Sequence, residues 1–299
     1  MTRFRSSSIA IMAALAALAA TTTPAVAQRD FSTVEIKTQK VAGNIYMLEG
    51  AGGNIGVSAG EDGILIVDDQ FKPLADKIRA ALKGINPGKL RYVLNTHFHG
   101  DHVGSNEIFG AEATIIAHDN VRKRISTRQE SSRGVVEALA KEGWPVITFD
   151  ASVSVHFNGE EIRVIHVPNG HTDGDSIIHF TGANVVHMGD QMFAGHFPFI
   201  DLEGGGTLRG YTKNIADIIA QLPADVKIIP GHGPLSTLDD LKAMHKMLVG
   251  TADIVQKKIK EGKSLESIIS EGLPEYESWN WQFISTKTWI ETLHKELSK

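Results

Sequence analysis

Short apolar runs bounded by glycine and polar residues dominate the first half of the 299-residue chain. The stretches "NIYMLEG", "GILIVDD" and "RYVLNTH" are typical of strands buried in a sheet. Before the last of these, "KPLADKIRAALKGI" has apolar side chains at helical spacing, with Pro73 near its start and Gly84 near its end. The pattern predicts buried strands with a helix over residues 72–85.

The second half repeats this organisation with different residues. After the strand "TIIAH", the polar stretch over residues 121–142 is predicted to be helical. The runs "SVSVHFN", "EIRVIHV", "SIIHFTG" and "NVVHMGD" follow each other closely, as in an antiparallel set of strands. A helix over residues 211–222, the strand "VKIIP" and a helical region from residue 238 complete the chain. Two strand-rich halves, each followed by helices, predict two packed sheets with helices outside.

The N-terminus has the pattern of a secretory signal peptide. Arg3 and Arg5 precede an apolar run over residues 9–20, and small residues follow up to Ala27. A membrane anchor is the weaker alternative, because a bilayer-spanning helix needs about 20 apolar residues. We expect a signal peptide over residues 1–27, a single domain over residues 28–299, and a periplasmic or secreted mature protein.

Composition narrows the classes of partner. The chain has no cysteine, which excludes a disulfide framework and a lipid anchor on cysteine. Its formal charge is −5, and becomes −7 when Arg3 and Arg5 leave with the signal peptide. This acidic balance argues against binding to nucleic acid or to an anionic membrane surface. A small-molecule substrate is the expected partner, and the sequence leaves the oligomeric state open.

The stretch "NTHFHGDHVGSNEIFG" places four candidate metal ligands within six positions: His97, His99, Asp101 and His102. His97 and His99 are two apart in an extended segment and face the same side, and the chain then turns past Gly100. Imidazole nitrogens together with a carboxylate are a ligand set that suits zinc and neighbouring metals. The spacing therefore indicates a metal site at the end of a strand.

This H-x-H-x-D-H pattern after an apolar strand resembles the metallo-β-lactamase superfamily. Three later stretches resemble its other metal motifs: "PNGHTDGDS" with His171, "VVHMGD" with Asp190 and "IIPGHG" with His232. The motifs come in the expected order, each at the end of an apolar strand. The resemblance extends from about residue 40 to residue 240.

The resemblance implies an α/β fold, an αββα sandwich of two mixed β-sheets with helices on the outer faces and two zinc ions at the edge between the sheets. It also implies a role for each of seven residues. His97, His99 and His171 would hold one zinc ion, Asp101, His102 and His232 the second, and Asp190 would bridge them. A hydroxide between the metals would attack a carbonyl, and Asp101 would be the catalytic residue that orients it and moves its proton.

Two positions bear on the branch of the superfamily. His99 stands where the diiron members carry glutamate, which favours zinc, with iron and manganese as alternatives. Asp190 stands where one major β-lactamase branch has cysteine, which resembles glyoxalase II-like thioesterases and lactonases. The signal peptide and "GHTDGDS" resemble the secreted β-lactamases instead. The leading interpretation is an exported zinc hydrolase of amide or ester-type bonds, with β-lactams among its substrates. The alternatives are a glyoxalase II-like thioesterase or lactonase, and a non-catalytic metal-binding protein.

Several other residues are secondary candidates. His196, in the loop over residues 193–207, is a candidate for substrate contact. Asp68 ends a strand and either supports a metal ligand or forms a plain turn. "GAGGNIG" is expected to be a tight hairpin near the metal site rather than a nucleotide loop. The remaining histidines in strand patterns are interpreted as structural or surface residues: His118, His156, His166, His179 and His187. Trp279, Trp281 and Trp289 are interpreted as core or interface residues.

Overall fold

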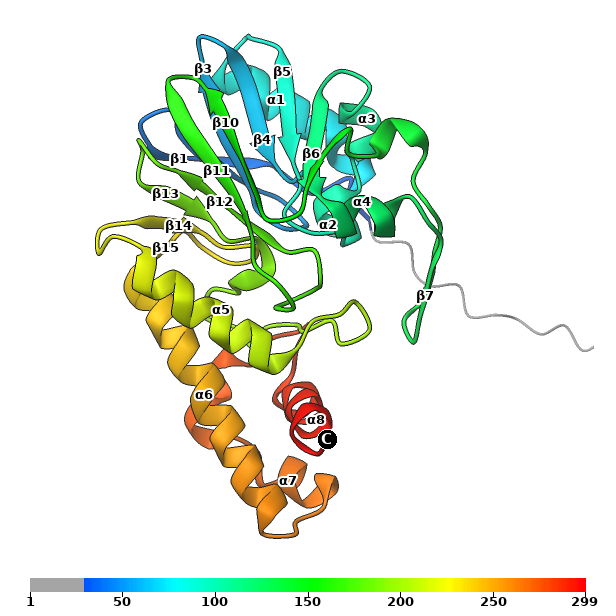
Figure 1. The fold of residues 1–299 in the computed structure, drawn as a ribbon, viewed down its shortest axis with the longest axis vertical. Helices are drawn as coiled ribbons and strands as arrows, with labels where there is room; N and C mark the ends of the chain where they lie inside the picture. Colours follow the sequence, from blue (N-terminus) through cyan, green and yellow to red (C-terminus); the bar gives the residue numbers. More distant parts are fainter. Residues whose placement is uncertain (1–29) are drawn as a thin grey trace, which may run out of the picture.

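The computed structural model describes residues 30–299, so the predicted signal peptide over residues 1–27 lies outside the described residues. Two β-sheets pack face to face, and helices cover their outer faces (Figure 1). The predicted αββα sandwich of mixed sheets is confirmed.

The first sheet has seven strands in the order β1-β2-β3-β4-β5-β6-β9. Strands β1 to β4 pair in antiparallel fashion, whereas β4, β5, β6 and β9 run parallel. The strands are β1 Lys37–Ala42, β2 Ile45–Glu49, β3 Ile55–Gly60, β4 Gly63–Val67, β5 Leu90–Leu94, β6 Thr114–His118 and β9 Ile147–Phe149. Because β4, β5 and β6 are parallel, their carboxyl ends meet at one edge of the sandwich.

The second sheet has six strands in the order β10-β11-β12-β13-β14-β15. The run from β10 to β13 is antiparallel, as its close spacing predicted, and β14 then pairs in parallel with β13. The strands are β10 Ser152–Phe157, β11 Glu160–His166, β12 Ser176–Phe180, β13 Val185–His187, β14 Lys227–Ile229 and β15 Ser236–Thr237.

Alternation of side chains along the strands divides the core into layers. In β4, Leu65 and Val67 join the cluster between the sheets, and Ile64 and Ile66 join the cluster on the other face. That outer cluster includes Ile78 and Leu82 of helix α1 (Ala75–Ile85), which covers the first sheet. A strand with both faces covered must be apolar at every position, which is why "GILIV" has no polar side chain.

The outer face of the second sheet is covered by helices from the C-terminal part of the chain. They are α5 Leu208–Gln221, α6 Leu238–Lys260 and α8 Thr286–Leu297, with the short α7 Leu265–Glu271 beside α8. Figure 1 shows α6 running away from the sandwich, with α7 and α8 packed back along it. The shorter helices α2 Gly100–Val103, α3 Asn106–Phe109 and α4 Asp119–Ile125 lie beside the first sheet.

The prediction of a helix over residues 121–142 is wrong for most of its length. Helix α4 ends at Ile125, and an antiparallel hairpin follows, made of β7 Gln129–Ser131 and β8 Gly134–Val136. The hairpin extends from the body of the protein (Figure 1). Gly134 has a φ of +119°, which disfavours a helix, and Val135 and Val136 are β-branched residues that favour strands.

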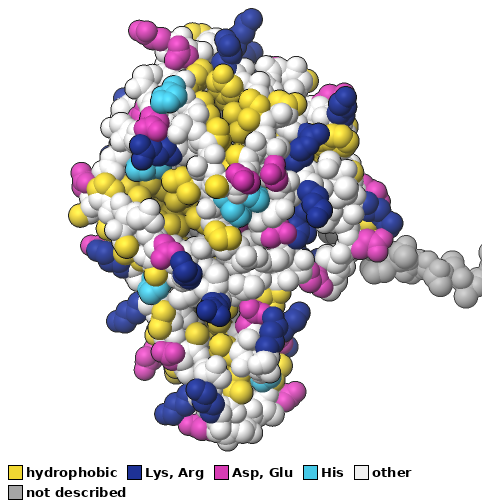
Figure 2. Space-filling model, viewed as in Figure 1, with side chains coloured by type: hydrophobic (Ala, Val, Ile, Leu, Met, Phe, Trp, Pro, Cys, Tyr) yellow, Lys and Arg dark blue, Asp and Glu magenta, His cyan; other side chains and the backbone are white. Residues whose placement is uncertain are grey.

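Charges of both signs are interspersed over the face shown in Figure 2, and neither sign forms a continuous field there. Hydrophobic side chains gather in the upper part of the same face, over the two sheets. Over residues 30–299, no helix combines the length and apolar character needed to cross a bilayer.

Candidate metal centre

The seven residues singled out in the sequence come together at one edge of the sandwich. His97 and His99 follow β5, and Asp101 and His102 lie in α2 directly after them. The other three follow strands of the second sheet. His171 lies after β11, Asp190 lies in a short 3-10 turn (Gly189–Gln191) after β13, and His232 lies after β14. Each side chain therefore lies in a short segment that follows a strand, where the rigid sheets anchor the chain.

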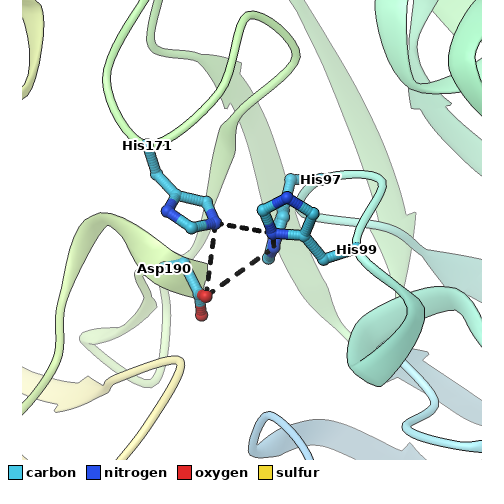
Figure 3. Close-up of side chains that lie close together, drawn as sticks. All are labelled: His97, His99, His171 and Asp190. Carbon is cyan, nitrogen blue, oxygen red and sulfur yellow. Dashed lines mark hydrogen bonds and ion pairs between the residues drawn. The ribbon is translucent and has the colours of Figure 1, made fainter. Parts of the chain in front are cut away.

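The first group consists of His97, His99, His171 and Asp190 (Figure 3). His99 Nδ1 lies 3.1 Å from His97 Nε2 and 2.9 Å from His171 Nε2. Asp190 Oδ2 lies 3.7 Å from His97 Nε2 and 3.4 Å from His171 Nε2. Four donor atoms from three loops thus converge on one point.

The second group consists of Asp101, His102 and His232. Asp101 Oδ2 lies 3.7 Å from His102 Nε2 and 3.4 Å from His232 Nε2. The other oxygen of Asp190, Oδ1, lies 3.1 Å from His102 Nε2 and 3.4 Å from His232 Nε2. Asp190 therefore presents one carboxylate oxygen to each group.

The donor set fits a transition metal. Bonds of about 2.0–2.1 Å to nitrogen and oxygen place tetrahedral neighbours about 3.3 Å apart, close to the separations within both groups. Among the described residues, His102 Nε2 and Asp190 Oδ1 are buried and have no hydrogen-bond partner, although they are close enough to interact electrostatically. Buried polar atoms without partners are costly, and coordination to a metal removes that cost.

Asp68 supports one histidine in each group. Its Oδ1 accepts from the Thr96 backbone N–H at 2.8 Å, and its Oδ2 accepts from Thr96 Oγ1 and from His102 Nδ1, both at 2.7 Å. Since the Thr96 hydroxyl donates to Asp68, it accepts from His97 Nδ1 at 3.0 Å. Both imidazoles then carry their proton on Nδ1 and direct the Nε2 lone pair into the centre. Of the two roles expected for Asp68, support of a metal ligand matches these contacts.

His171 and His99 are oriented by other acceptors. His171 Nδ1 donates to the Phe199 carbonyl at 2.7 Å, which leaves Nε2 free. His99 is turned the other way: its Nε2 donates to Asp201 Oδ2 at 2.8 Å and Nδ1 faces the centre. Arg133, in the β7–β8 hairpin, donates to the same Asp201 oxygen at 2.7 Å. Burial raises the pKa of Asp201, but the bond to His99 and the charge of Arg133 outweigh it and hold that pKa below its ordinary value.

The electrostatics of the centre favour a cation. Burial alone would raise the pKa of Asp190, but the neighbouring histidines, foremost His102 and His232, outweigh it and hold that pKa well below its ordinary value. Burial lowers the pKa of His97, and lowers that of His171 to about 3. Burial also lowers the pKa of His102 and of His232, but the carboxylates of Asp190 and Asp101 outweigh it and raise both pKa values. Metals bind ionised carboxylates and neutral imidazoles, so binding at the second group would release protons from these two histidines.

The loop between β2 and β3 closes over the second group, which confirms the hairpin expected from "GAGGNIG". Gly53 N–H donates to the Asp101 carbonyl at 3.1 Å, and Asn54 N–H donates to the Gly231 carbonyl at 2.7 Å. A β-carbon at Gly53 would lie 2.1 Å from His102 Cε1. Only glycine leaves room for the His102 ring against this hairpin.

Replacing Gly53 by alanine is expected to displace His102 and weaken metal binding at the second group by about 10- to 100-fold, the usual cost of disturbing a ligand's support. Metal content after dialysis against graded chelator measures this. Gly84→Ala, on α1, is the matched control, because a β-carbon there meets nothing within 4 Å. Equal metal retention by the two variants would contradict the assigned role of Gly53.

The strand histidines lie outside both groups. His118 and His166 stack at 3.7 Å, and each bonds a backbone carbonyl. His187 is buried and contacts the Asn54 carbonyl at 3.0 Å. His156 and His179 are in β10 and β12, and among residues 30–299 none of the five joins a metal-ligand group.

Asp201 and Arg133 were not predicted from the sequence. Trp281 packs against the core cluster of the second sheet, as predicted, but its second position at the site was not predicted. Trp289 is fully buried in the core, as predicted, but Trp281 lies beside the metal centre, 6.2 Å from His232 between ring centroids. The candidate His196 stacks on Trp281 at 4.8 Å. Trp281 lies almost 50 residues beyond the last motif, so only the path of the C-terminal segment brings it to the site.

Comparisons with known proteins agree with this geometry. Residues 39–232 match the sequence profile described as the metallo-beta-lactamase superfamily, and all seven candidate ligands lie within this range. A hydroxyacylglutathione hydrolase from Gloeobacter violaceus is 29% identical over 170 residues, which cover 56% of this chain and 59% of that protein. A second, from Nitrosococcus oceani, is 30% identical over 154 residues, 49% of this chain and 50% of that protein. The alignments thus span about half to three-fifths of these relatives.

Solved structures extend the comparison to the fold. A metallo-beta-lactamase from Pontibacter korlensis superposes with a TM-score of 0.59 at 14% identity, covering 72% of this chain and 99% of that one. The profile match and the two curated relatives named hydroxyacylglutathione hydrolases together support a hydrolase enzyme with a metal site.

Proposed function

The chain belongs to the metallo-β-lactamase superfamily, and from that premise we propose that it is an exported dizinc hydrolase that opens amide, ester or thioester bonds of small molecules. The observation that carries the proposal is the position of Asp190. Its Oδ2 faces the first group and its Oδ1 faces the second. A carboxylate divided between two sets of histidines supports a pair of metal ions, because a single ion would use only one set.

The roles follow from the donor atoms. His97, His99 and His171 would hold one zinc ion, Asp101, His102 and His232 the other, and Asp190 both. When bound, a zinc pair polarises a carbonyl and lowers the pKa of water, so that a nucleophile is available near neutral pH. The chain itself supplies the orientation of the ligands, through Asp68 and Asp201, and a group that can move a proton.

Asp101 is that group. The Asp101 side chain is 28% exposed, the largest exposed fraction among the seven candidate ligands. It lies between His102 and His232. A carboxylate there can accept a proton from the attacking water and pass it to the leaving group or to solvent.

Asp101→Asn is expected to lower kcat by about 10²-fold or more while the fold and most of the metal remain, because asparagine keeps the shape but cannot carry the proton. Steady-state kinetics with metal analysis of the same sample measures both. Asp119→Asn, an exposed change at the start of α4, should leave kcat unaltered. Near-normal turnover by Asp101→Asn would remove Asp101 from the mechanism.

A thioester hydrolase is the second candidate within this reaction class. The curated relatives named hydroxyacylglutathione hydrolases align with the part of the chain that carries the motifs, and Asp190 is a carboxylate rather than a cysteine. A shared carboxylate neutralises part of the charge of both metals. Compared with a cysteine at this position, it would make the second ion bind the β-lactam carboxylate less tightly. It would also make that ion stabilise the departing nitrogen less when the ring opens.

We therefore expect measurable but modest β-lactamase activity, with kcat/KM below about 10⁴ M⁻¹ s⁻¹. The test compares a penicillin, a cephalosporin and a carbapenem with a lactone and a glutathione thioester, on purified mature protein. High efficiency on several β-lactams would refute this interpretation of Asp190. Turnover of the thioester or lactone alone would favour the second candidate, and no turnover of any substrate would overturn the hydrolase proposal.

Export completes the proposal, and its support is the signal-like pattern over residues 1–27. The mature protein would act in the periplasm or outside the cell without a membrane or nucleic acid partner. N-terminal sequencing of protein from the extracytoplasmic fraction should begin at Gln28. Recovery of the intact N-terminus in the cytoplasm would contradict export.

A further inference from the structure

Three aromatic side chains, Phe199, Trp281 and Phe283, form a continuous surface at the metal centre, here called the aromatic wall. Phe283 lies 5.8 Å from Phe199 and 5.6 Å from Trp281 between ring centroids. Both pairs are close to perpendicular, an edge-to-face arrangement that aromatic rings favour.

The wall runs alongside both metal-ligand groups. Phe199 lies 5.8 Å from the His99 ring and 5.7 Å from the His171 ring, so it borders the first group. Trp281 lies 6.2 Å from the His232 ring and borders the second group. A substrate whose carbonyl reaches the metal centre would therefore have the wall within contact range of its acyl group.

The C-terminal segment that carries Trp281 and Phe283 is fixed to the loop that carries Phe199. Trp281 Nε1 donates to the Phe197 carbonyl at 2.9 Å, and Phe197 N–H donates to the Trp279 carbonyl at 2.8 Å. The Trp281 ring also stacks on His196, with the planes 16° apart. These contacts hold the wall in place before substrate arrives, which reduces the entropy cost of binding.

The wall is apolar and open to solvent. Phe283 is 58% exposed, and Phe199 and Trp281 are half-buried. Arg133 lies over Phe199, 4.5 Å from the ring centroid, but its guanidinium is already paired with Asp201. Because Asp201 neutralises Arg133, the wall offers no free positive charge to an anionic group. An exposed apolar surface of this kind beside the proposed catalytic centre suits an uncharged apolar group better than a polar or anionic one.

We propose that the aromatic wall binds the acyl portion of the substrate and selects apolar, preferably aromatic, acyl groups. Trp281 and Phe283 lie beyond residues 39–232, so the family match does not imply this selectivity. The proposal rests on the proposed hydrolase function, which supplies the carbonyl at the metal centre.

The test compares two thioesters with the same small leaving group, the phenylacetyl and acetyl thioesters of N-acetylcysteamine, on metal-loaded mature protein. The wild type should favour the phenylacetyl thioester by at least about 10-fold in kcat/KM, the scale of an apolar pocket's discrimination. Phe283→Ala should lower this ratio about 10-fold. Val146→Ala, which removes a 71% exposed apolar side chain beside the edge strand β9, is the matched control and should keep the wild-type ratio.

Calorimetric titration with phenylacetate and with acetate gives a readout that does not depend on turnover. Both acids carry the same carboxylate, so tighter binding of phenylacetate measures the ring alone, and Phe283→Ala should abolish the difference. The role of the wall would be overturned if Phe283→Ala kept the wild-type preference for the phenylacetyl thioester or the wild-type affinity for phenylacetate. Equal binding of the two acids by the wild type would overturn it too. If the wild type turns over neither these thioesters nor the β-lactams and lactone of the substrate panel, but binds phenylacetate in a Phe283-dependent manner, the hydrolase proposal fails and the apolar subsite stands.

Discussion

Removal of metal with a chelator is expected to lower hydrolysis by at least about 10³-fold, since the proposed reaction depends on bound metal to polarise the carbonyl and to lower the pKa of the attacking water. Adding Zn²⁺ back to the stripped protein should restore activity in proportion to the metal bound. Initial rates before chelation, after it and during readdition measure this.

Circular dichroism on the stripped protein is the control for unfolding, because the cores on both sides of the sheets contain no candidate ligand and should keep the fold. Full activity in the stripped, folded protein would contradict a metal-dependent reaction. If Zn²⁺ does not restore activity but Fe²⁺ or Mn²⁺ does, the site is a metal centre that uses a metal other than zinc.

Asp190→Asn is expected to reduce kcat/KM by about 10³-fold or more and to lower the metal content toward one ion per chain. The amide keeps the shape of the side chain but removes the negative charge that both groups share, and offers only one oxygen. The ionised state of Asp190 follows from its pKa, which the histidines hold well below the ordinary value against the effect of burial. The backbone anchor of this residue, the bond from Tyr211 Oη to the Asp190 carbonyl at 2.8 Å, is unaffected by the change.

Asp225→Asn is the matched control for this experiment, because Asp225 is exposed and contacts only the Asn184 side chain among the described side-chain hydrogen bonds. It should retain both the metal and the activity. Two ions per chain in Asp190→Asn, with turnover within about tenfold of the wild type, would mean that the carboxylate is not the shared ligand.

The candidate ligands could be predicted from sequence because each lies in a short segment that follows an apolar strand. The strand pattern of "RYVLNTH" fixes His97 at a sheet edge, and "NVVHMGD" and "VKIIPGHG" bring Asp190 and His232 to the same edge. Parallel pairing of β13 with β14 brings the last two together. Local patterns are sufficient when rigid strands carry the side chains.

The supporting residues could not be predicted in the same way. Asp201 and Arg133 meet only because a loop after Asp190 and the β7–β8 hairpin lie next to each other, and neither segment has a periodic pattern. The hairpin lies within the segment predicted to be helical, because a polar stretch without clear periodicity gives no sign of the turn at Gly134. Trp281 depends on the packing of α6 and α8 against the second sheet, a long-range consequence of the core. Placement that depends on tertiary packing has no local sequence signal.

Elemental analysis of fully active mature protein shows whether the Asp190 carboxylate joins two metal sites. With protein concentration determined by amino-acid analysis, we expect two transition-metal ions per chain, with activity rising until the second is bound. Full activity with one ion per chain, or with none, would contradict this expectation.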